Sequence, residues 1–292
     1  MRAHRADDPP IAVNTTPFTS ADLSRLLSGY AIVLDDHSYL PTEPIAQCRD
    51  LKHVVFLGTG AASYMDIAAL RELGITVHTI KGYGDTAVAE HTIALLFACA
   101  REVARMDREV RAGTWQPAEG MQLFGKTLGI VGLGGIGREV ARIATGIGME
   151  VIAWNRTPRP GNDIALVDLD TLLARADVIS LHLVLNDETR GLIDAERLAR
   201  VKPGAILINT ARAALVDEAA LIAALSDGRL RHAGLDVFHG EPLAPDHPLA
   251  QRENVTITAH AAFRTIEASE TLLRRAIDIV RRIIADSAGA TR

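Results

Sequence analysis

The sequence predicts an α/β protein made of two doubly wound parallel-sheet domains. Apolar runs of strand length alternate with helical patterns along most of the chain. From residue 127 onward the apolar runs are nearly continuous, as expected for strands that helices cover on both faces. The 292 residues suffice for one large domain or two of ordinary size, and a hydrophobic fraction of 48% can fill the cores.

The first hundred residues predict a small parallel α/β domain. Segments such as MDIAALRELG separate short apolar runs, which are IAVNTT, AIVLDD, VVFLGTG and GITVHTI. One long amphipathic helix is predicted from Glu90 to Arg111, because apolar residues recur there every three to four positions. Gly113 ends this helix, and TWQPAEG is predicted to be a loop.

A stricter alternation predicts the second domain. The predicted strands are TLGIVGLG, MEVIAW, VISLHLV, AILINTA, HAGLDVF and NVTITAH, and the predicted helices between them are GIGREVARIATGIG, DLDTLLARA, IDAERLARV and DEAALIAALSDG. A last helix is predicted from Thr265 to about Ile284. Because a glycine-rich turn falls near residue 132, we expect residues 91–264 to form the domain that carries this turn. Residues 1–90 and 265–292 would form the smaller domain, with a cleft between the two.

The composition argues against several classes of protein. A net charge of −5 disfavours a nucleic-acid partner. Cys48 and Cys99 have neither metal-ligand spacing nor a disulfide framework, so we expect a reducing compartment and no bound metal. The N-terminal MRAHRADDPPIAV lacks an apolar signal core, and the longest apolar stretch, TIALLFACA, is too short to span a bilayer. We expect a soluble, cytoplasmic protein.

The turn VGLGGIG has the GxGxxG spacing, with Gly132, Gly134 and Gly137 between a predicted strand and a predicted helix. The first glycine permits a tight turn, the second lets the backbone approach a pyrophosphate, and the third lets helix and strand pack closely. The helix N-terminus then offers free N–H groups to the phosphates. This context predicts a Rossmann-like dinucleotide site, in which Gly135 and Ile136 also contact the cofactor.

The tip of the next strand, VIAWNRT, predicts which dinucleotide is bound. An acid about 20 residues after the glycines usually holds the ribose 2′-hydroxyl, but Asn155 stands 18 residues after Gly137 (155 − 137). A neutral amide does not repel a 2′-phosphate, and Arg156 can bind that phosphate bidentately, with Thr157 adding a hydroxyl. The pattern favours NADP. The alternative is NAD, with Asn155 on a free ribose and Arg156 in solvent.

Several motifs in order, from about Leu51 to Thr265, resemble the D-isomer-specific 2-hydroxyacid dehydrogenases, the family of glycerate, hydroxypyruvate, glyoxylate and phosphoglycerate dehydrogenases. The motifs are VVFLGTGAASYMDIAALRELGITVHTIKGYGDTAVAEHTIALL, RAGTW, FGKTLGIVGLGGIG, LHLVLNDETRGLI, LINTARAALVDEAAL, AGLDVFHGEPL and ITAH. The resemblance implies an enzyme that transfers a hydride between NAD(P) and a small 2-keto or 2-hydroxy acid.

The resemblance also assigns roles to residues of this chain. Arg212 would grip the substrate, His260 would be the acid/base, and Glu241 would partner the histidine. Asp236 would lie beside the nicotinamide amide, and His182, Thr210 and Ala211 would contact the cofactor. The substrate carboxylate would also meet backbone N–H groups at Gly60 and Ala61.

The chemistry of these residue types agrees with those roles. Histidine suits proton transfer because its ordinary pKa of about 6.5 lies near the working pH, and a carboxylate on its other nitrogen orients the ring. Arginine matches a planar carboxylate and polarises the ketone. Arg212, Glu241 and His260 all follow predicted strands, and ligands of such sheets bind beyond the carboxyl ends of the strands.

Departures from the family pattern leave the substrate open. Ala259 and Val184 replace usual prolines, and Thr79 and Lys81 stand where Asn and Pro are common. Glyoxylate and hydroxypyruvate are the first expectations; a phosphorylated or dicarboxylic acid is the alternative, through Lys81 or Arg264, and Phe263 would shape the pocket. A scaffold or corepressor that senses the dinucleotide is the rival from another class. The long helix and the GTW segment suggest a homodimer.

Overall fold

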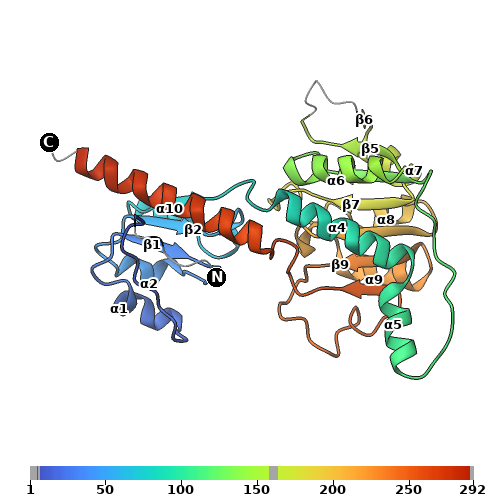
Figure 1. Ribbon diagram of the computed structural model, residues 1–292, viewed down its shortest axis with the longest axis horizontal. Helices are drawn as coiled ribbons and strands as arrows, with labels where there is room; N and C mark the ends of the chain where they lie inside the picture. Colours follow the sequence, from blue (N-terminus) through green and yellow to red (C-terminus); the bar gives the residue numbers. More distant parts are fainter. Residues whose placement is uncertain (1–4, 6, 158–163, 290–292) are drawn as a thin grey trace. The chain divides into compact units, whose positions relative to one another are not determined.

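A computed structural model describes residues 5, 7–157 and 164–289 of the protein (Figure 1). The chain divides into two compact units. Unit 1 comprises Met1–Gly84 and Arg264–Arg292, and unit 2 comprises Asp85–Phe263. Each unit contains a parallel sheet with helices packed on it, so the predicted α/β class with two parallel-sheet domains is confirmed.

Unit 2 is built on a seven-stranded parallel sheet in the order β10-β9-β8-β7-β4-β5-β6. The strands are β4 (Thr127–Val131), β5 (Glu150–Trp154), β6 (Ala165–Leu166), β7 (Val178–Leu181), β8 (Ala205–Asn209), β9 (Leu230–Leu235) and β10 (Val255–Ile257). Since all pairs are parallel, the carboxyl ends of the strands share one edge of the sheet. The chain order reverses between β4 and β7, where α/β sheets of this kind bind their ligands.

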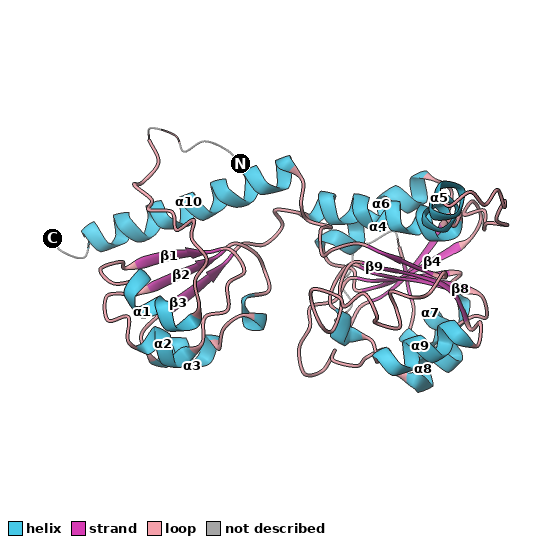
Figure 2. Cartoon of the chain, turned by 90° about the horizontal axis from the view of Figure 1, so that it is seen from below, coloured by secondary structure: helices cyan, strands magenta, loops and turns pink. Residues whose placement is uncertain are grey.

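Helices cover both faces of this sheet (Figure 2). One face carries α4 (Asp85–Ala100) and α6 (Gly135–Gly146), and the other carries α7 (Leu169–Arg175), α8 (Ala195–Arg200) and α9 (Glu218–Ser226). Three of these helices begin at an aspartate whose side chain accepts a hydrogen bond from the first helical turn, namely Asp168, Asp194 and Asp217. Such caps satisfy N–H groups that a helix cannot satisfy itself.

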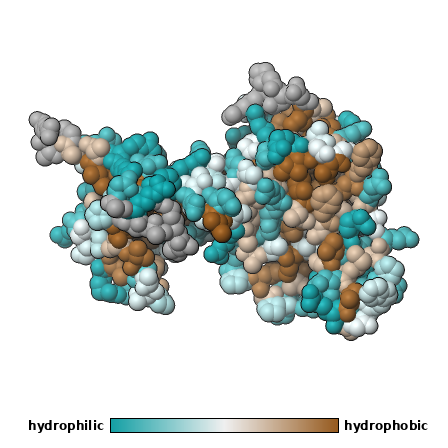
Figure 3. Space-filling model, viewed as in Figure 1, coloured by the Kyte–Doolittle hydropathy of each residue, from teal (hydrophilic) through white to brown (hydrophobic). Residues whose placement is uncertain are grey.

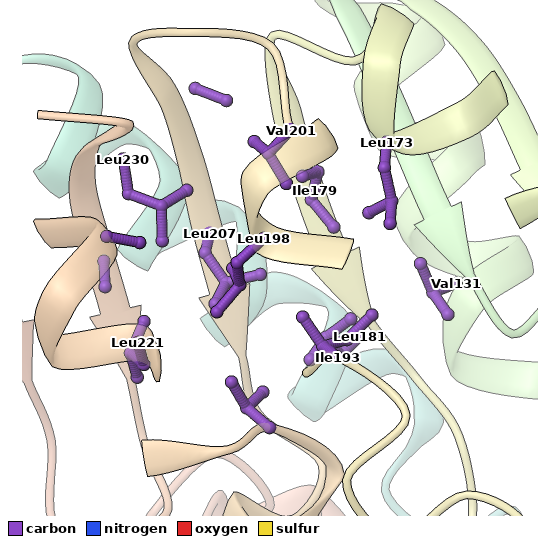
Figure 4. Close-up of a cluster of buried hydrophobic side chains, with 14 of the residues drawn as sticks. Val131, Leu173, Ile179, Leu181, Ile193, Leu198, Val201, Leu207, Leu221 and Leu230 are labelled. Carbon is purple, nitrogen blue, oxygen red and sulfur yellow. The ribbon is translucent and has the colours of Figure 1, made fainter. Parts of the chain in front are cut away.

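Strand residues alternate between the two cores of unit 2. Ile179, Leu181 and Leu207 point to the layer of α7, α8 and α9, where they are almost fully buried with Leu173, Leu198 and Leu221 (Figure 4). Val178, Ile206 and Ile208 point instead to α4 and α6. This arrangement explains the continuous apolar runs in the sequence, because both faces of every central strand are covered.

Unit 1 has a three-stranded parallel sheet in the order β1-β2-β3, with β1 (Ile32–Asp35), β2 (His53–Phe56) and β3 (Thr76–Thr79). Its short helices α1 (Leu23–Leu26), α2 (Thr42–Ala46) and α3 (Ile67–Glu72) cover one face, and α10 (Ile266–Gly289) covers the other (Figure 2). Although α10 has 24 residues, no helix in the described part of the chain is long and apolar enough to cross a membrane.

The prediction of one helix from Glu90 to Arg111 is wrong. The segment forms α4 and a separate α5 (Val103–Arg111), because Glu102 adopts a left-handed backbone conformation with φ +52°. The carbonyl of Ala100 accepts from the backbone N–H of Met121 at 2.6 Å, and the Glu102 side chain pairs with Arg105 and Arg231. Contacts distant in sequence therefore break the helix despite its continuous apolar pattern.

The first apolar run, IAVNTT, is not a strand either. Its residues are mostly exposed, and Val13 is 75% exposed. The side chain of Asn14 accepts from the backbone N–H and the hydroxyl of Thr16, which makes a local turn. A run with no partner strand and no buried face cannot join the sheet.

Candidate active site

The glycine turn joins β4 to α6 at the point where the strand order reverses. Gly132 has φ +105°, and a Cβ there would lie 2.7 Å from the carbonyl oxygen of His182. A Cβ on Gly137 would lie 2.2 Å from the carbonyl oxygen of Gly132, so only glycine lets the helix approach the strand. A Cβ on Gly134, the N-cap of α6, would meet nothing within 4 Å. The backbone is therefore open to a phosphate group there.

A pocket of about 510 Å³ opens beside this turn. It is lined by Gly132, Leu133, Gly134, Gly135, Arg138, Trp154, Asn155, Arg156, Thr157, His182, Leu183, Val184, Asn186 and Thr189. None of these described lining residues is acidic, whereas Arg138 and Arg156 are cationic. The pocket thus brings together predicted cofactor residues from three stretches of the chain. The predicted residues Ile136, Thr210, Ala211 and Asp236 do not line it.

The tip of β5 is held against the glycine turn. Asn155 Oδ1 accepts from the backbone N–H of Leu133 at 3.4 Å, and its Nδ2 donates to the carbonyl of Thr157 at 2.7 Å. Arg156 forms an ion pair with Glu188, and both side chains are largely exposed, at 61% and 68%. The guanidinium is therefore available to a ligand that outcompetes an exposed carboxylate.

His182 follows β7 and lines the same pocket. Its Nε2 lies 2.7 Å from the hydroxyl of Ser180. Burial lowers the pKa of His182 to about 4, so the ring is neutral at neutral pH. A neutral ring can contact a cofactor, but it is a poor proton donor for a ketone.

His260 and Glu241 meet beyond the ends of β9 and β10. The imidazole Nδ1 lies 2.7 Å from Glu241 Oε2, and Glu241 Oε1 accepts from the backbone N–H of Phe238 at 2.9 Å. The two side chains are 30% and 35% exposed, so water and small molecules can reach them. With Nδ1 directed at the carboxylate, Nε2 is the nitrogen that can exchange a proton with a ligand.

Arg212 follows β8 at the same edge of the sheet. Its loop is clamped by the buried Asn209, whose Oδ1 accepts from the backbone N–H of Ala211 at 3.0 Å and whose Nδ2 donates to the carbonyl of Arg212 at 2.9 Å. The guanidinium donates to the carbonyl of Ala211 at 2.6 Å. The side chain is half-buried, which suits a cation that binds a carboxylate.

Asp236 is fully buried directly after β9. Its Oδ1 accepts from the Thr258 hydroxyl at 2.5 Å and from the backbone N–H of Ala261 at 2.9 Å, and its Oδ2 accepts from the backbone N–H of Ala262 at 2.9 Å. The backbone N–H of His260 donates to the Asp236 carbonyl at 2.9 Å. This residue therefore fixes the loop that carries His260.

Gly60 and Ala61 lie in unit 1, at the start of the short 3-10 helix Ala61–Ser63. Gly60 is its N-cap, and the backbone N–H groups at the start of a helix have no partner within the helix. Lys81 is exposed, and its carbonyl accepts from Arg275. In unit 2 the ring of Phe263 packs edge-on against His260, with 6.4 Å between ring centroids.

Sequence reasoning missed four buried or partly buried polar residues behind the candidate site, namely His91, Thr92, Asn209 and Thr258. Their hydrogen bonds join positions more than a hundred residues apart in two cases, Thr92 with Thr210 and His91 with Thr258. One signal was present, since Asn209 and Thr258 are polar residues at the ends of apolar strand runs. Buried polar groups need partners, so such positions indicate a network.

Comparisons with known proteins agree with this geometry. The family model described as D-isomer specific 2-hydroxyacid dehydrogenase, NAD binding domain, matches residues 93–262. The chain is 36% identical to a glycerate dehydrogenase of Methylorubrum extorquens over 92% of its length and 87% of the relative's. It is 38% identical to a D-3-phosphoglycerate dehydrogenase of Archaeoglobus fulgidus over 87% of its length, but it spans only 49% of that longer protein.

A solved structure is similar over most of the fold. It is an acyclic imino acid reductase (Bsp5) in complex with NADPH and D-Arg, with 32% identity and a TM-score of 0.84 over 92% of this chain and 87% of that one. The motifs, the two parallel-sheet units, the glycine pocket and these similarities agree on one family. The chain belongs to the D-isomer-specific 2-hydroxyacid dehydrogenases and is an NAD(P)-dependent oxidoreductase of that family.

Proposed function

We propose that the enzyme reduces a small 2-keto acid, glyoxylate or hydroxypyruvate, with NADPH and forms the D-configured 2-hydroxy acid. The observation that carries the proposal is the 2.7 Å contact between His260 and Glu241 at the sheet edge that also holds the Arg212 loop and the glycine turn. A proton donor, a cation and a dinucleotide pocket are the three parts that this reduction requires.

Each part has a defined task. The nicotinamide cofactor supplies the hydride when bound. His260 gives its Nε2 proton to the ketone oxygen, and Glu241 stabilises the imidazolium before that transfer and orients the ring. Arg212 binds the substrate carboxylate and stabilises negative charge on the ketone oxygen. Unit 1 offers the backbone N–H groups at Gly60 and Ala61 as a second binding element for a carboxylate.

The preference for NADP rests on the charge of the pocket. A 2′-phosphate carries negative charge, and the described lining offers Arg138 and Arg156 with no acid among them. Asn155 occupies the strand tip and its amide bonds to the backbone of Leu133 and Thr157, so this position adds no carboxylate. Glu188, which pairs with Arg156, is exposed and can be displaced by a phosphate. The similar imino acid reductase was solved with NADPH.

The preference for a short, uncharged substrate tail rests on unit 1. The loop after β1 lies beside the loop of Gly60 and Ala61, because the backbone N–H of Leu57 donates to the carbonyl of Asp35 at 2.8 Å and that of Leu40 donates to the carbonyl of Tyr64 at 2.9 Å. The β1 loop carries Asp35 and Asp36, and Arg264 offsets only part of that negative charge. A phosphate or a second carboxylate would be repelled there.

We also propose that the enzyme is a homodimer assembled through unit 2. Large apolar side chains are exposed on or after α4 and α5, at Phe97, Val103, Val110, Trp115 and Phe124. Figure 3 shows hydrophobic residues gathered over α4 and α6 on the visible face of this unit. Light scattering should give twice the chain mass, and Trp115→Ser should shift the population toward the monomer.

Steady-state kinetics with NADPH and NADH on a panel of 2-keto acids tests the cofactor and substrate. We expect higher kcat/KM with NADPH, and higher kcat/KM for glyoxylate and hydroxypyruvate than for oxaloacetate or phosphohydroxypyruvate. Arg156→Ala should raise the KM for NADPH about tenfold without changing that for NADH. Arg142→Ala is the control, since Arg142 is another exposed arginine paired with a glutamate. A higher kcat/KM with NADH would overturn the cofactor assignment.

His260→Ala tests the reaction. We expect kcat to fall by about a thousandfold, because general acid catalysis typically contributes 10²–10⁴. His247→Ala is the matched control, because His247 also contacts a glutamate, Glu218 at 3.3 Å, with exposed fractions of 25% and 26%. Unchanged reduction by His260→Ala would remove the assignment, and tight NADPH binding without turnover of any keto acid would favour a scaffold.

A further inference from the structure

His91 and Thr92 are consecutive residues of α4, and each contacts a different strand-end loop of unit 2. The helix packs against β8, β9 and β10, the strands that precede the Arg212, Glu241 and His260 loops. Neither residue lines the cofactor pocket, and neither belongs to the set that the proposed chemistry uses. Their hydrogen bonds nevertheless connect them to the loops that carry His260 and Arg212.

The first chain of hydrogen bonds runs from His91 to Asp236. His91 Nε2 lies 3.0 Å from Thr258 Oγ1, and the Thr258 hydroxyl donates to Asp236 Oδ1 at 2.5 Å. A hydroxyl has one hydrogen, so a Thr258 that donates to Asp236 must accept from His91. His91 therefore carries its proton on Nε2, and its N–H fixes the rotamer of the threonine.

Asp236 in turn fixes the backbone of the His260 loop through hydrogen bonds. The backbone N–H groups of His260, Ala261 and Ala262 all donate to Asp236, the first to its carbonyl and the other two to its carboxylate. His260 has φ +49°, a left-handed conformation that costs a non-glycine residue about 1 kcal/mol or more. The three hydrogen bonds offset that cost and hold the imidazole at Glu241.

The second chain runs from Thr92 to the Arg212 loop. The Thr92 hydroxyl donates to the carbonyl of Val88 at 2.8 Å, so the Thr210 hydroxyl 2.9 Å away must donate to Thr92. Both threonines are buried, at 1% and 8% exposed. Thr210 lies directly between the clamping Asn209 and the Ala211–Arg212 segment, so this bond anchors the loop to α4.

We propose that His91 and Thr92 are positioning residues for the reduction, His91 holding the His260 loop through Thr258 and Asp236, and Thr92 holding the Arg212 loop through Thr210. The inference rests on the proposed function, because it concerns the placement of those two side chains. The two chains have different kinetic signatures. Proton transfer occurs only in the transition state, so loosening His260 lowers kcat. Arg212 binds the carboxylate from the start, so loosening it mainly raises the KM for the keto acid, with a smaller fall in kcat from its weaker contact with the ketone oxygen.

Thr258→Val tests the first chain, since it removes the hydroxyl and keeps the shape. We expect kcat to fall about tenfold, with the KM for NADPH within twofold of the parent enzyme. Thr258→Ser keeps the hydroxyl and should restore kcat.

Thr256→Val is the matched control. Thr256 lies on β10, two residues before Thr258. It is buried and makes an equivalent contact with a histidine, His232 Nε2 at 3.0 Å. It lies outside the chain that leads to His260. This variant should lose stability without changing kcat, which separates positioning from general loss of packing.

His91→Leu and His91→Gln repeat the test at a side chain that is 25% exposed and tolerates change better than a buried one. Leucine should lower kcat about tenfold, and glutamine, whose Nε2 can replace the donor, should stay within threefold. If Thr258→Val and His91→Leu leave kcat where Thr256→Val leaves it, the His91 half is overturned. If His260→Ala remains active, the proposed function itself is wrong. If His260→Ala is inactive but the Thr258 and His91 variants keep the parent kcat, only the positioning role is wrong.

Thr92→Val tests the second chain. We expect the KM for the keto acid to rise about tenfold while kcat changes less than threefold, and Thr92→Ser should remain near the parent enzyme. Binding of NADPH, followed by quenching of tryptophan fluorescence, should be unchanged. A Thr92→Val enzyme with the parent KM, or one whose loss Thr92→Ser does not rescue, overturns the Thr92 half.

Discussion

Two buried aspartates end parallel strands in this enzyme, and their surroundings differ. Asp236, after β9 of unit 2, is 0% exposed and its carboxylate accepts three hydrogen bonds. Asp35, the last residue of β1 in unit 1, is 4% exposed, and its Oδ2 has no hydrogen-bond partner within the described ranges. Burial raises the pKa of Asp35 to about 6.

The difference shows that partners, rather than burial, decide whether a strand-end carboxylate stabilises the fold. A buried charge costs free energy unless hydrogen bonds replace its water. Unit 2 supplies them to Asp236 from its own loop, whereas in unit 1 Asp35 is hydrogen-bonded by Ser38, whose backbone N–H donates to the other oxygen at 3.1 Å and whose side chain also contributes. At a third strand end, after β5, the charged side chains of Arg156 and Glu188 pair while both remain largely exposed to solvent.

Asp236→Ala should have the largest effect. It leaves two backbone N–H groups and the Thr258 hydroxyl without their acceptor inside the protein, so we expect a loss of about 4 kcal/mol in the free energy of unfolding of unit 2. Urea unfolding followed by tryptophan fluorescence measures it, because Trp115 and Trp154 both lie in unit 2. Asp227→Ala is the control, since Asp227 accepts from the backbone N–H of Arg229 at an exposed turn. Equal losses for the two variants would show that burial of Asp236 adds nothing.

Asp35→Asn should have the opposite effect at neutral pH and raise the free energy of unfolding of unit 1. A carboxyl whose pKa rises from 3.8 unfolded to about 6 folded contributes stability that is present below pH 3.8 and is lost as the pH rises through 6. The difference corresponds to roughly 3 kcal/mol above pH 7. Asparagine stays neutral, so the variant should be more stable than the parent at pH 8 and equal to it at pH 4.

Hydrogen exchange of the β1 and β2 amides measures this effect in unit 1, where tryptophan fluorescence is silent. Asp36→Asn is the neighbouring control, because a hydrogen bond from His37 lowers the pKa of Asp36 and its side chain is 77% exposed. That variant should be slightly less stable at pH 8. A parent protein whose β1 amides are equally protected at pH 4 and pH 8 would contradict the unpaired state of Asp35.

Features that depend on neighbouring residues could be predicted from the sequence, whereas features that depend on distant contacts could not. The glycine turn is local, since Gly132 and Gly137 are five positions apart and their backbone demands follow from spacing alone. The strand and helix alternation of unit 2 was equally legible because apolar periodicity reports burial directly. The break between α4 and α5 was not, because Met121 and Arg231, distant in sequence, cause it.

The candidate site divides in the same way. Arg212, Glu241 and His260 could be singled out because each follows an apolar strand run and resembles a family motif. The partners that hold them could not, since His91 and Thr258 are 167 residues apart and only the packing of α4 on β10 brings them together. Nor does any local pattern distinguish the satisfied Asp236 from the unsatisfied Asp35.

The smallest effect is expected at the exposed strand end. Glu188→Gln should leave stability unchanged, because ion pairs between side chains that are 61% and 68% exposed contribute little. It should nevertheless lower the KM for NADPH two- to threefold, because Arg156 no longer has to break its ion pair with Glu188 before it binds the 2′-phosphate. The KM for NADH should not change. The gain should vanish in about 0.5 M salt, which screens exposed charges. Glu139→Gln, at the exposed Arg142 pair, should change neither KM. If Glu188→Gln lowers the KM for NADH as much as that for NADPH, Arg156 does not read the phosphate, and the strand end contributes charge to the pocket without selecting the cofactor.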